Sequence, residues 1–347
     1  MKADKRREPI TSAGAWVGRD IQDDRSWIVQ LDTVAIAEVD AALGHVKRSG
    51  LQIPYPASAF PLPRLEAKLG AIRDELENGR GFVLIRGLPR DRYTDDECEL
   101  VYWGLIAHLG TPVSQNARGH LLGHVRDEGR VKSDPNARLY QTRERMDFHT
   151  DVLPVDLLGL FCLRGAKSGG ESKVVSALTI HNVLLEERPD LLEALYGAFH
   201  LDWRGEEPQG EKPFFTIPMF SEREGQVTAR LVSILYYKSA ARFGDEYAPT
   251  PIQLEALEKV QEIANRPELM LSMDFQEGDI QLLNNHTTLH ARTGFEDYDE
   301  PGKQRHLLRM WIAVPEAYRR PLADTLADRY GWVQRGGIPV KDGATVT

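Results

Sequence analysis

Residues 147–152 read Asp-Phe-His-Thr-Asp-Val and belong to a short strand-like run over 146–152. Side chains two apart in a strand point to the same face, so His149 and Asp151 share one face. An imidazole nitrogen and a carboxylate oxygen placed in this way can hold one metal ion. The same motif also suits the polar, solvent-facing end of a strand, so by itself it leaves both interpretations open.

Strand-like runs of this kind recur along the C-terminal two thirds of the chain. Two helical segments interrupt them: residues 180–196, with an internal turn signal at Pro189-Asp190, and residues 251–264, capped by Thr250. The other expected strands are 157–163, 172–177, 227–234, 280–283 and 309–314. Because strands and helices do not alternate regularly, this order favours an antiparallel β core covered by helices.

The N-terminal third is mostly helical. Apolar residues at helical spacing predict helices over 34–48, 65–76 and 95–109. Residues 81–87 differ, because a short apolar run between two glycines predicts a buried strand. Residues 203–225 are rich in glycine, proline and charge, and we expect a long loop there that acts as a lid.

Composition excludes several classes of protein. The chain has 347 residues, with 43 basic and 52 acidic side chains and a net charge of −9. An acidic protein lacks the field that draws proteins to nucleic acids or anionic membranes, and no apolar run is long enough for a transmembrane helix. Two cysteines, Cys98 and Cys162, exclude a disulfide framework and fit a reducing cytoplasm. No signal peptide is visible at the start.

A second candidate ligand lies 141 residues beyond the first. Residues 279–290 run from a Gly-Asp turn through an apolar strand and an Asn-Asn turn to His290. A lone histidine here is more often structural. Combined with His149 and Asp151, it completes a two-histidine, one-carboxylate set, which leaves open positions on iron.

Two arginines follow in a mostly apolar run over 305–312. Arginine is rarely buried without a partner, and its planar fork matches a carboxylate. Arg305 therefore either reaches solvent or an aspartate at a strand end, or binds a carboxylate ligand. Arg309, four residues later, shares its face in a strand, and is either a salt-bridge residue or a substrate contact.

Taken together, these segments resemble the TauD/TfdA-type Fe(II)/2-oxoglutarate-dependent dioxygenases of the clavaminate synthase-like superfamily. That family has His-x-Asp, a distal histidine and an arginine some 10–15 residues further on. Here the pattern is His149-Thr-Asp151, His290 and Arg305, which follows His290 by 15 residues. A Gly-Gly turn at 169–170 precedes Ser172, where the family places a hydroxyl residue, more often threonine. The resemblance covers residues 80–316.

The resemblance implies a double-stranded β-helix (jelly-roll, cupin-like) core flanked by helices, in an α+β fold that is mainly β. It implies Fe(II) held by His149, Asp151 and His290, and 2-oxoglutarate held by Arg305 and Ser172. The implied reaction consumes O2, releases succinate and CO2, and most often hydroxylates an unactivated C–H bond of a small molecule. A carboxylate as the third ligand argues against halogenation.

The motifs also revise the number of domains. Length favours about two domains, at about 150 residues each. His149 and His290 must meet at one iron, so we expect a single catalytic domain. The expected parts are a mobile tail (1–14), the domain (15–335) with its helical cover (30–110), jelly-roll core (80–316) and lid insert (203–225), and a C-terminal tail (336–347).

The substrate is less well defined by the sequence. Arg145 and Asp147 share the face of His149 in a regular strand, and Asn116 lies next to Gln115 in a polar loop. Each is a candidate substrate contact, as is Arg309, although a solvated strand end is the simpler interpretation of the first two. Trp203, Phe214 and Phe215 lie in the expected lid, where they either close on the substrate or pack the loop down.

Two other functions stay open at this stage. His-x-x-x-His pairs at 120–124 and 286–290 would each bind zinc if they were helical, which is the pattern of a zinc hydrolase. Neither has the glutamate of His-Glu-x-x-His. A non-catalytic jelly-roll binding protein is disfavoured, because the three ligands and the arginine are all present. A homo-oligomer is possible.

Overall fold

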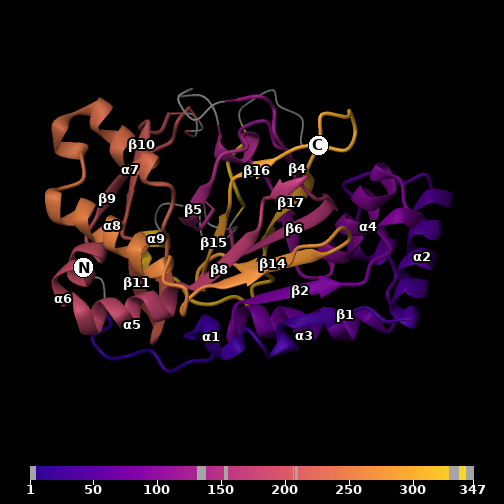
Figure 1. Ribbon diagram of the computed structural model, residues 1–347, viewed down its shortest axis with the longest axis horizontal. Coiled ribbons are helices and arrows are strands. Elements are labelled where there is room, and N and C mark those ends of the chain that lie inside the picture. The colour runs from indigo at the N-terminus through magenta and orange to yellow at the C-terminus, as the bar shows by residue number, and fades with distance from the viewer. Residues whose placement is uncertain are drawn as a thin grey trace.

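The computed structural model describes residues 5–130, 138–151, 155–205, 207, 210–327 and 336–340. Two β-sheets lie between two groups of helices (Figure 1). The larger sheet has the strand order β1-β2-β14-β6-β17-β3, and β4 also pairs with β17. Its strands are β1 (Ile28–Gln30), β2 (Phe82–Arg86), β3 (Thr111–Val113), β4 (Leu122–Val125), β6 (Leu157–Arg164), β14 (Ile280–Asn284) and β17 (His306–Ala313).

The smaller sheet carries the His-x-Asp segment. Its order is β13-β8-β15-β5, and its pairs are all antiparallel. The strands are β5 (Met146–His149), β8 (Ser172–Ser176), β13 (Leu271–Met273) and β15 (Thr288–Arg292). The strand expected at 172–177 is therefore present, but the strand expected at 146–152 is shorter, because β5 ends at His149 and Asp151 follows it outside the strand. Val152 lies outside the described residues.

The two sheets face each other across one apolar core. Leu158 from the larger sheet belongs to the same buried cluster as Val174 and Leu289 from the smaller sheet. Residues 285–287 carry the chain directly from β14 in one sheet to β15 in the other. Facing sheets that are antiparallel apart from the β1–β2 pair, with helices outside, are the arrangement of a double-stranded β-helix, so the predicted fold class is confirmed.

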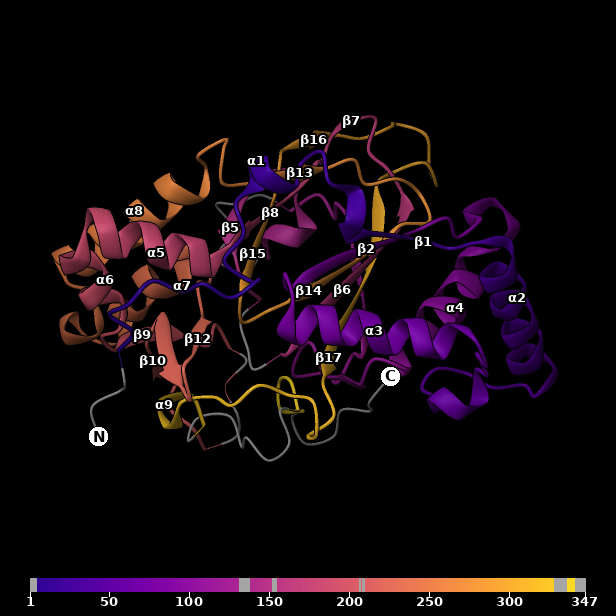
Figure 2. The ribbon, with the colours of Figure 1, turned by 90° about the horizontal axis from the view of Figure 1, so that it is seen from below.

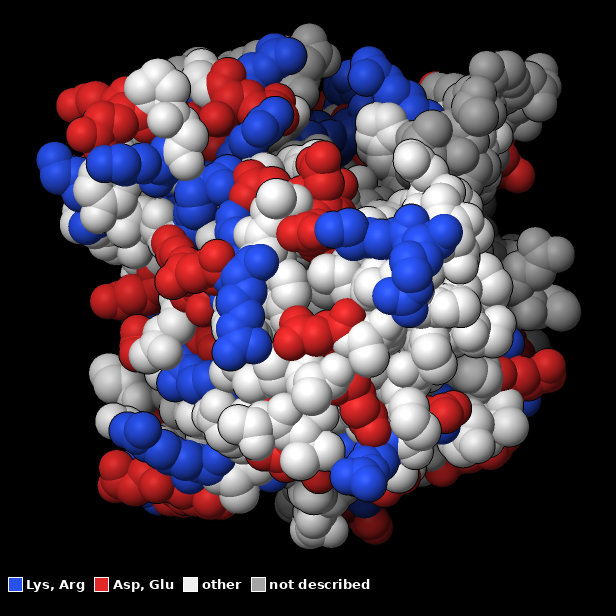
Figure 3. Space-filling model, turned by 90° about the vertical axis from the view of Figure 1, so that its right-hand side faces the viewer, with Lys and Arg blue, Asp and Glu red and all other residues white. Residues whose placement is uncertain are grey.

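The N-terminal helices cover the outer face of the larger sheet. They are α2 (Thr33–Arg48), α3 (Leu65–Asn78) and α4 (Asp95–Ala107), close to the predicted bounds. Val83 and Ile85 of β2 point to these helices, whereas Leu84 points to the core between the sheets. This explains why β2 is apolar along its length. On the face that carries these helices, basic and acidic side chains are interspersed (Figure 3).

The second group of helices lies at the other end of the molecule (Figures 1 and 2). Residues 180–196 form two helices rather than one, because Pro189 starts a new helix directly after the first ends. The helices are α5 (Ala177–Glu187), α6 (Pro189–Leu195), α7 (Ile234–Ser239) and α8 (Pro251–Ala264), with α1 (Gly18–Ile21) and α9 (Asp324–Ala327) as short additions.

Two assignments from the sequence are wrong in this region. The strand expected over 227–234 ends at Ala229, and Ile234 already begins α7. The loop expected over 203–225 contains strands, because its aromatic residues pack together: Phe215 is buried, and its ring packs against that of Trp203 in a tilted arrangement. The strands here form hairpins of β9 (Phe199–Asp202) with β10 (Phe214–Ile217) and of β11 (Phe220–Arg223) with β12 (Gln226–Ala229), and β7 (Ser168–Gly169) pairs with β16 (Phe295–Glu296).

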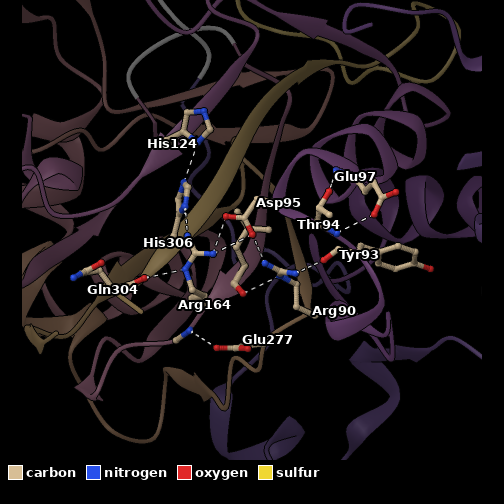
Figure 4. Close-up of polar contacts among 12 residues, drawn as sticks. Arg90, Tyr93, Thr94, Asp95, Glu97, His124, Arg164, Glu277, Gln304 and His306 are labelled. Carbon is tan, nitrogen blue, oxygen red and sulfur yellow. Dashed lines mark hydrogen bonds and ion pairs between the residues drawn. The ribbon is translucent and has the colours of Figure 1, made fainter. Parts of the chain in front are cut away.

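A polar network joins α4 to the larger sheet (Figure 4). Arg164, at the end of β6, forms an ion pair with Asp95 at 2.8 Å and lies 3.0 Å from Nδ1 of His306. The other ring nitrogen of His306 lies 2.9 Å from Nδ1 of His124 on β4. Arg90 also pairs with Asp95. The network fixes the start of β17, which carries Arg309 and directly follows Arg305.

The described part of the expected N-terminal tail, residues 5–14, lies against α5 and α6. The backbone nitrogen of Ile10 donates to Asn182 at 2.8 Å, and that of Arg6 donates to the Tyr196 hydroxyl at 3.2 Å. Among the described residues, no helix combines the length and the apolar character that crossing a membrane requires.

Candidate metal and co-substrate site

His149, Asp151 and His290 come together at the open end of the smaller sheet. Antiparallel pairing of β5 with β15 places His149 opposite His290, and their ring centroids are 4.2 Å apart. Oδ1 of Asp151 lies 3.8 Å from Nε2 of His149 and 3.7 Å from Nε2 of His290. The three ligand atoms all lie within 4.8 Å of one another. Among the described residues, this is the one such group of histidine, cysteine or carboxylate side chains.

Hydrogen bonds orient the ligand atoms. Nδ1 of His149 donates to the carbonyl oxygen of Asp147 at 2.8 Å, so its Nε2 carries the lone pair that a metal needs. Oδ2 of Asp151 accepts from Nε1 of Trp311 and from Nη1 of Arg309 at 3.3 Å. These two bonds leave Oδ1 of Asp151 facing the imidazoles.

The backbone of Asp151 is held just as firmly. The amide oxygen of Asn285 accepts from the Asp151 nitrogen at 2.8 Å, and its amide nitrogen donates to the Asp151 carbonyl at 3.2 Å. Asn285 is buried in the crossing between β14 and β15. One side chain therefore ties the carboxylate ligand to the segment that leads to His290.

The protonation states suit metal binding. Burial and the neighbouring His149 lower the pKa of His290 to about 3, so its imidazole is neutral at physiological pH. Burial opposes ionisation of Asp151, but the positive charge of Arg309 and the hydrogen bond from Trp311 help to hold its pKa below the usual value. Nδ1 of His290 is buried and has no hydrogen-bond partner among the described residues. Two neutral imidazoles and one carboxylate fit a ferrous ion and leave positions for further ligands.

Arg305 and Ser172 lie in a cavity behind this cluster. The cavity is lined by Ser172, Arg305 and all three ligand residues. Arg305 is only 4% exposed, and its Nη1 has no partner among the described residues. Burial lowers the pKa of Arg305 from its usual value. The Ser172 hydroxyl lies 2.9–3.0 Å from the amide of Gln281. The sequence thus brings a guanidinium and a hydroxyl to the place where the resemblance puts a co-substrate carboxylate.

The guanidinium of Arg309 points to the group formed by His149, Asp151 and His290, and not to solvent. Its guanidinium lies between the rings of Tyr140 and Trp311, with centroids at 4.8 and 4.9 Å. Its Nε donates to Oε1 of Gln115 at 2.7 Å. Gln115 in turn donates to the carbonyl oxygens of Leu121 and Arg309. Arg309 therefore belongs to the site.

A larger cavity of about 390 Å³ opens on the other side of the cluster. Arg309, Arg145, Asp147 and Asn116 all line it, together with His149 and Asp151. Arg145 and Asp147 lie at its exposed rim, where they pair with each other at 3.1 Å. Asn116 contacts the ring of His120 at 3.1 Å.

Several residues of the site escaped the sequence analysis. No sequence motif predicts a role for Trp311, Asn285 or Arg292, because each acts through a contact with a residue that is distant in the sequence. Arg292 follows the predicted ligand His290 by two residues, which is the one available signal. It lies in the cavity with Arg305.

The structure contradicts the zinc-binding alternative, because neither His-x-x-x-His pair lies on a helix. His286 lies in the turn before β15, not on a helix, and its Nε2 contacts Asp156 at 2.9 Å within the core. His124 lies on β4, where it contacts His306. Neither pair shares a helical face, so neither can bind zinc in the manner of the helical motif.

A two-histidine, one-carboxylate cluster between facing sheets, with its carboxylate buried and its histidines partly buried, is the arrangement of a non-haem iron oxygenase. The family described as "Taurine catabolism dioxygenase TauD, TfdA family" matches residues 48–311. The chain belongs to this family. The predicted enzyme class, an Fe(II)- and 2-oxoglutarate-dependent dioxygenase, is confirmed by that membership.

Similar proteins come from bacteria and fungi. "FR-33289 synthase" of Streptomyces rubellomurinus (strain ATCC 31215) is 34% identical over 320 residues, covering 91% of this chain and 93% of the relative. "Taurine hydroxylase-like protein SAT17" of Stachybotrys chartarum (strain CBS 109288 / IBT 7711) is 33% identical over 311 residues, covering 85% and 77%. A solved structure of asparagine oxygenase with Fe(II), 2S,3S-3-hydroxyasparagine and succinate has a TM-score of 0.62 at 17% identity, covering 82% and 93%. This last likeness is one of fold.

Proposed function

We propose that Nε2 of His149, Oδ1 of Asp151 and Nε2 of His290 hold the iron of this dioxygenase. The observation that carries the proposal is the convergence of these three atoms within 4.8 Å of one another, where Asp151 is buried and both histidines are partly buried. When bound, iron supplies the activation of O2 that couples loss of CO2 from 2-oxoglutarate to hydroxylation of an unactivated C–H bond. The protein orients the ligands and excludes water.

We further propose that Arg305 and Ser172 bind the distal carboxylate of 2-oxoglutarate. Arginine matches a carboxylate with two parallel donors, and burial strengthens this pairing because water does not compete. Support comes from the buried, unpartnered Nη1 of Arg305 in the cavity that also reaches the metal ligands.

The primary substrate in this proposal is a small molecule with an anionic group, bound in the 390 Å³ cavity. Arg309, Arg138 and Arg204 line that cavity, and Arg204 lies over the ring of Tyr236 at 5.3 Å. The names of the family and of the fungal relative include taurine, which carries a sulfonate. We place Asn116 and the Arg145–Asp147 pair at the rim as further contacts.

The setting of the enzyme is also part of the proposal. We expect one catalytic domain over 15–335, and a cytoplasmic location, because Cys98 and Cys162 are both free and buried. The homo-oligomer and the moving lid over 203–225 stay predictions from the sequence.

The proposal is tested by succinate release from 2-oxoglutarate with Fe(II), ascorbate and a panel of small sulfonates, phosphonates and carboxylates. Asp151→Ala removes a ligand and should abolish release. Asp96→Ala removes an exposed carboxylate on α4 and should leave release unchanged. Iron-dependent release at the wild-type rate by Asp151→Ala would refute the assignment of Asp151.

A further inference from the structure

β15 presents a second arginine to the cavity that holds Arg305. Arg292 follows His290 by two residues, and side chains two apart in a strand share one face. The register of β15 with β8 places Arg292 directly opposite Ser172. Directly opposed residues of an antiparallel pair point to the same side of the sheet. Arg292, Ser172 and Arg305 accordingly line one cavity together with the metal ligands.

Arg292 is buried, although among the described residues only one of its three guanidinium nitrogens has hydrogen-bond acceptors. It is 7% exposed. Its Nη2 donates to the carbonyl oxygen of Thr142 at 2.9 Å and also to that of Glu144. Its Nε and Nη1 are buried and have no hydrogen-bond partner among the described residues. Buried charged donors without acceptors are costly, so the arrangement calls for an acceptor that binds from the cavity.

Both guanidinium groups lie against the same aromatic ring. The guanidinium carbons of Arg292 and Arg305 lie 4.8 and 5.1 Å from the centroid of the same Phe295 ring. The ring face attracts both cations but carries no net charge. Asp297 accepts from the backbone nitrogen of Arg305 at 2.7 Å, and among the described residues no carboxylate forms an ion pair with either guanidinium. The cavity therefore holds two like charges with no protein anion between them.

We propose that Arg292 and Arg305 together bind the distal carboxylate of 2-oxoglutarate, so that the co-substrate site contains two guanidinium groups. This rests on the proposed function, which assigns that carboxylate to Arg305 and Ser172. A carboxylate has enough acceptor positions for both arginines. A 2-oxo acid that ends in a methyl group would leave both guanidiniums unpaired, so Arg292 also sets selectivity for dicarboxylic 2-oxo acids.

A purely structural role for Arg292 makes a different prediction. In that case Arg292 would serve only to hold the carbonyls of Thr142 and Glu144, next to β5. Its loss would then disturb His149 and weaken every 2-oxo acid equally. A role in binding the distal carboxylate weakens only those ligands that carry one.

The test compares two ligands on the full-length enzyme loaded with Mn(II), by isothermal titration calorimetry without turnover. 2-Oxoglutarate and 2-oxopentanoate have the same chain length, but the second has a methyl group in place of the distal carboxylate. The variants are Arg292→Gln and Arg292→Lys. Arg143→Gln, which removes an exposed arginine paired with Asp127, is the matched control.

For Arg292→Gln we expect the affinity for 2-oxoglutarate to fall about tenfold or more, as for the loss of a charge-assisted hydrogen bond, with the affinity for 2-oxopentanoate changed less than about threefold. Arg292→Lys keeps the charge but not the fork, and should lose part of the preference. Equal weakening of both ligands, or an unchanged preference, overturns the inference. If Arg292→Gln does not fold, the same comparison in Arg292→Lys decides. Failure of the wild type to bind 2-oxoglutarate would instead overturn the proposed function.

Discussion

At the residue scale, Arg309 depends on a neighbour that is far away in sequence. Gln115 accepts from Nε of Arg309 and donates to two backbone carbonyls, so its amide orientation is fixed. A Cβ added at Gly123 would lie 2.9 Å from Oε1 of Gln115, so a glycine at this position leaves space for the Gln115 amide. Gln115 therefore acts as a positioning residue for Arg309, which contacts Asp151.

We predict that Gln115→Ala raises the Michaelis constant for the primary substrate about tenfold, because the guanidinium of Arg309 loses its fixed orientation. The Michaelis constant for the co-substrate should change little, since Arg305 and Ser172 do not contact Gln115. Steady-state kinetics with each substrate varied in turn measures this split. Gln22→Ala, at an exposed position, is the control. A matching rise in both constants would show general damage to the site and contradict the assignment.

The three residues that we propose as metal ligands were easier to single out from the sequence than the residues that support them. His149, Asp151 and His290 stand in a spacing that the family shares, and the structure brings their side chains together. Trp311 and Asn285 bind Asp151 across 160 and 134 residues, and nothing local marks either of them. Such contacts depend on strand register, which a single sequence does not state.

At the scale of elements, polar contacts among Arg164, His306 and His124 join the strands β4, β6 and β17 at a junction. Arg164 donates to Nδ1 of His306, so the other ring nitrogen of His306 donates to His124. Hydrogen bonds with these donors and acceptors require both histidines to be neutral. Burial, His124 and Arg164 lower the pKa of His306 to about 4, although Asp95 opposes the shift.

The junction predicts a specific sensitivity to acid. The folded pKa of His306 lies below the unfolded value of about 6.5, so the unfolded chain binds the proton first. Stability is therefore complete above pH 6.5 and falls as the pH drops towards 4, by about 2 kcal/mol at pH 5 for this group. The free energy of unfolding is measured in urea at pH 7.5 and at pH 5.0. Its decrease between these two pH values should be smaller for His306→Gln than for the wild type. Exposed His45→Gln should behave like the wild type, and equal losses in all three proteins would refute the prediction.

Elements with strong local periodicity were predicted well, and those made by pairing were not. The helices α2, α3, α4 and α8 were predicted from apolar spacing and, for α8, from the Thr250 cap. The short hairpins within 199–229 were missed or misplaced, because Gly, Pro and charged residues surround strands of four residues. Their stability comes from partners such as Trp203 and Phe215, which only the folded chain brings together.

At the scale of the whole molecule, the site exists only where the two sheets face each other. The metal ligands come from the smaller sheet and its adjoining residue Asp151, whereas Arg309 and Trp311 come from β17 of the larger sheet. The N-terminal segment is part of the same unit, since Trp16 and Trp27 pack on Phe82 in the core. This packing supports the single catalytic domain that the distance between His149 and His290 in the sequence led us to expect.

The most direct test of the iron site is anomalous X-ray scattering at the iron edge, from crystals of the enzyme grown with Fe(II) without oxygen. We predict one strong peak within coordination distance of Nε2 of His149, Oδ1 of Asp151 and Nε2 of His290, and its loss in Asp151→Ala. A peak elsewhere in the molecule, or none at these three atoms in the iron-loaded enzyme, would contradict the assignment.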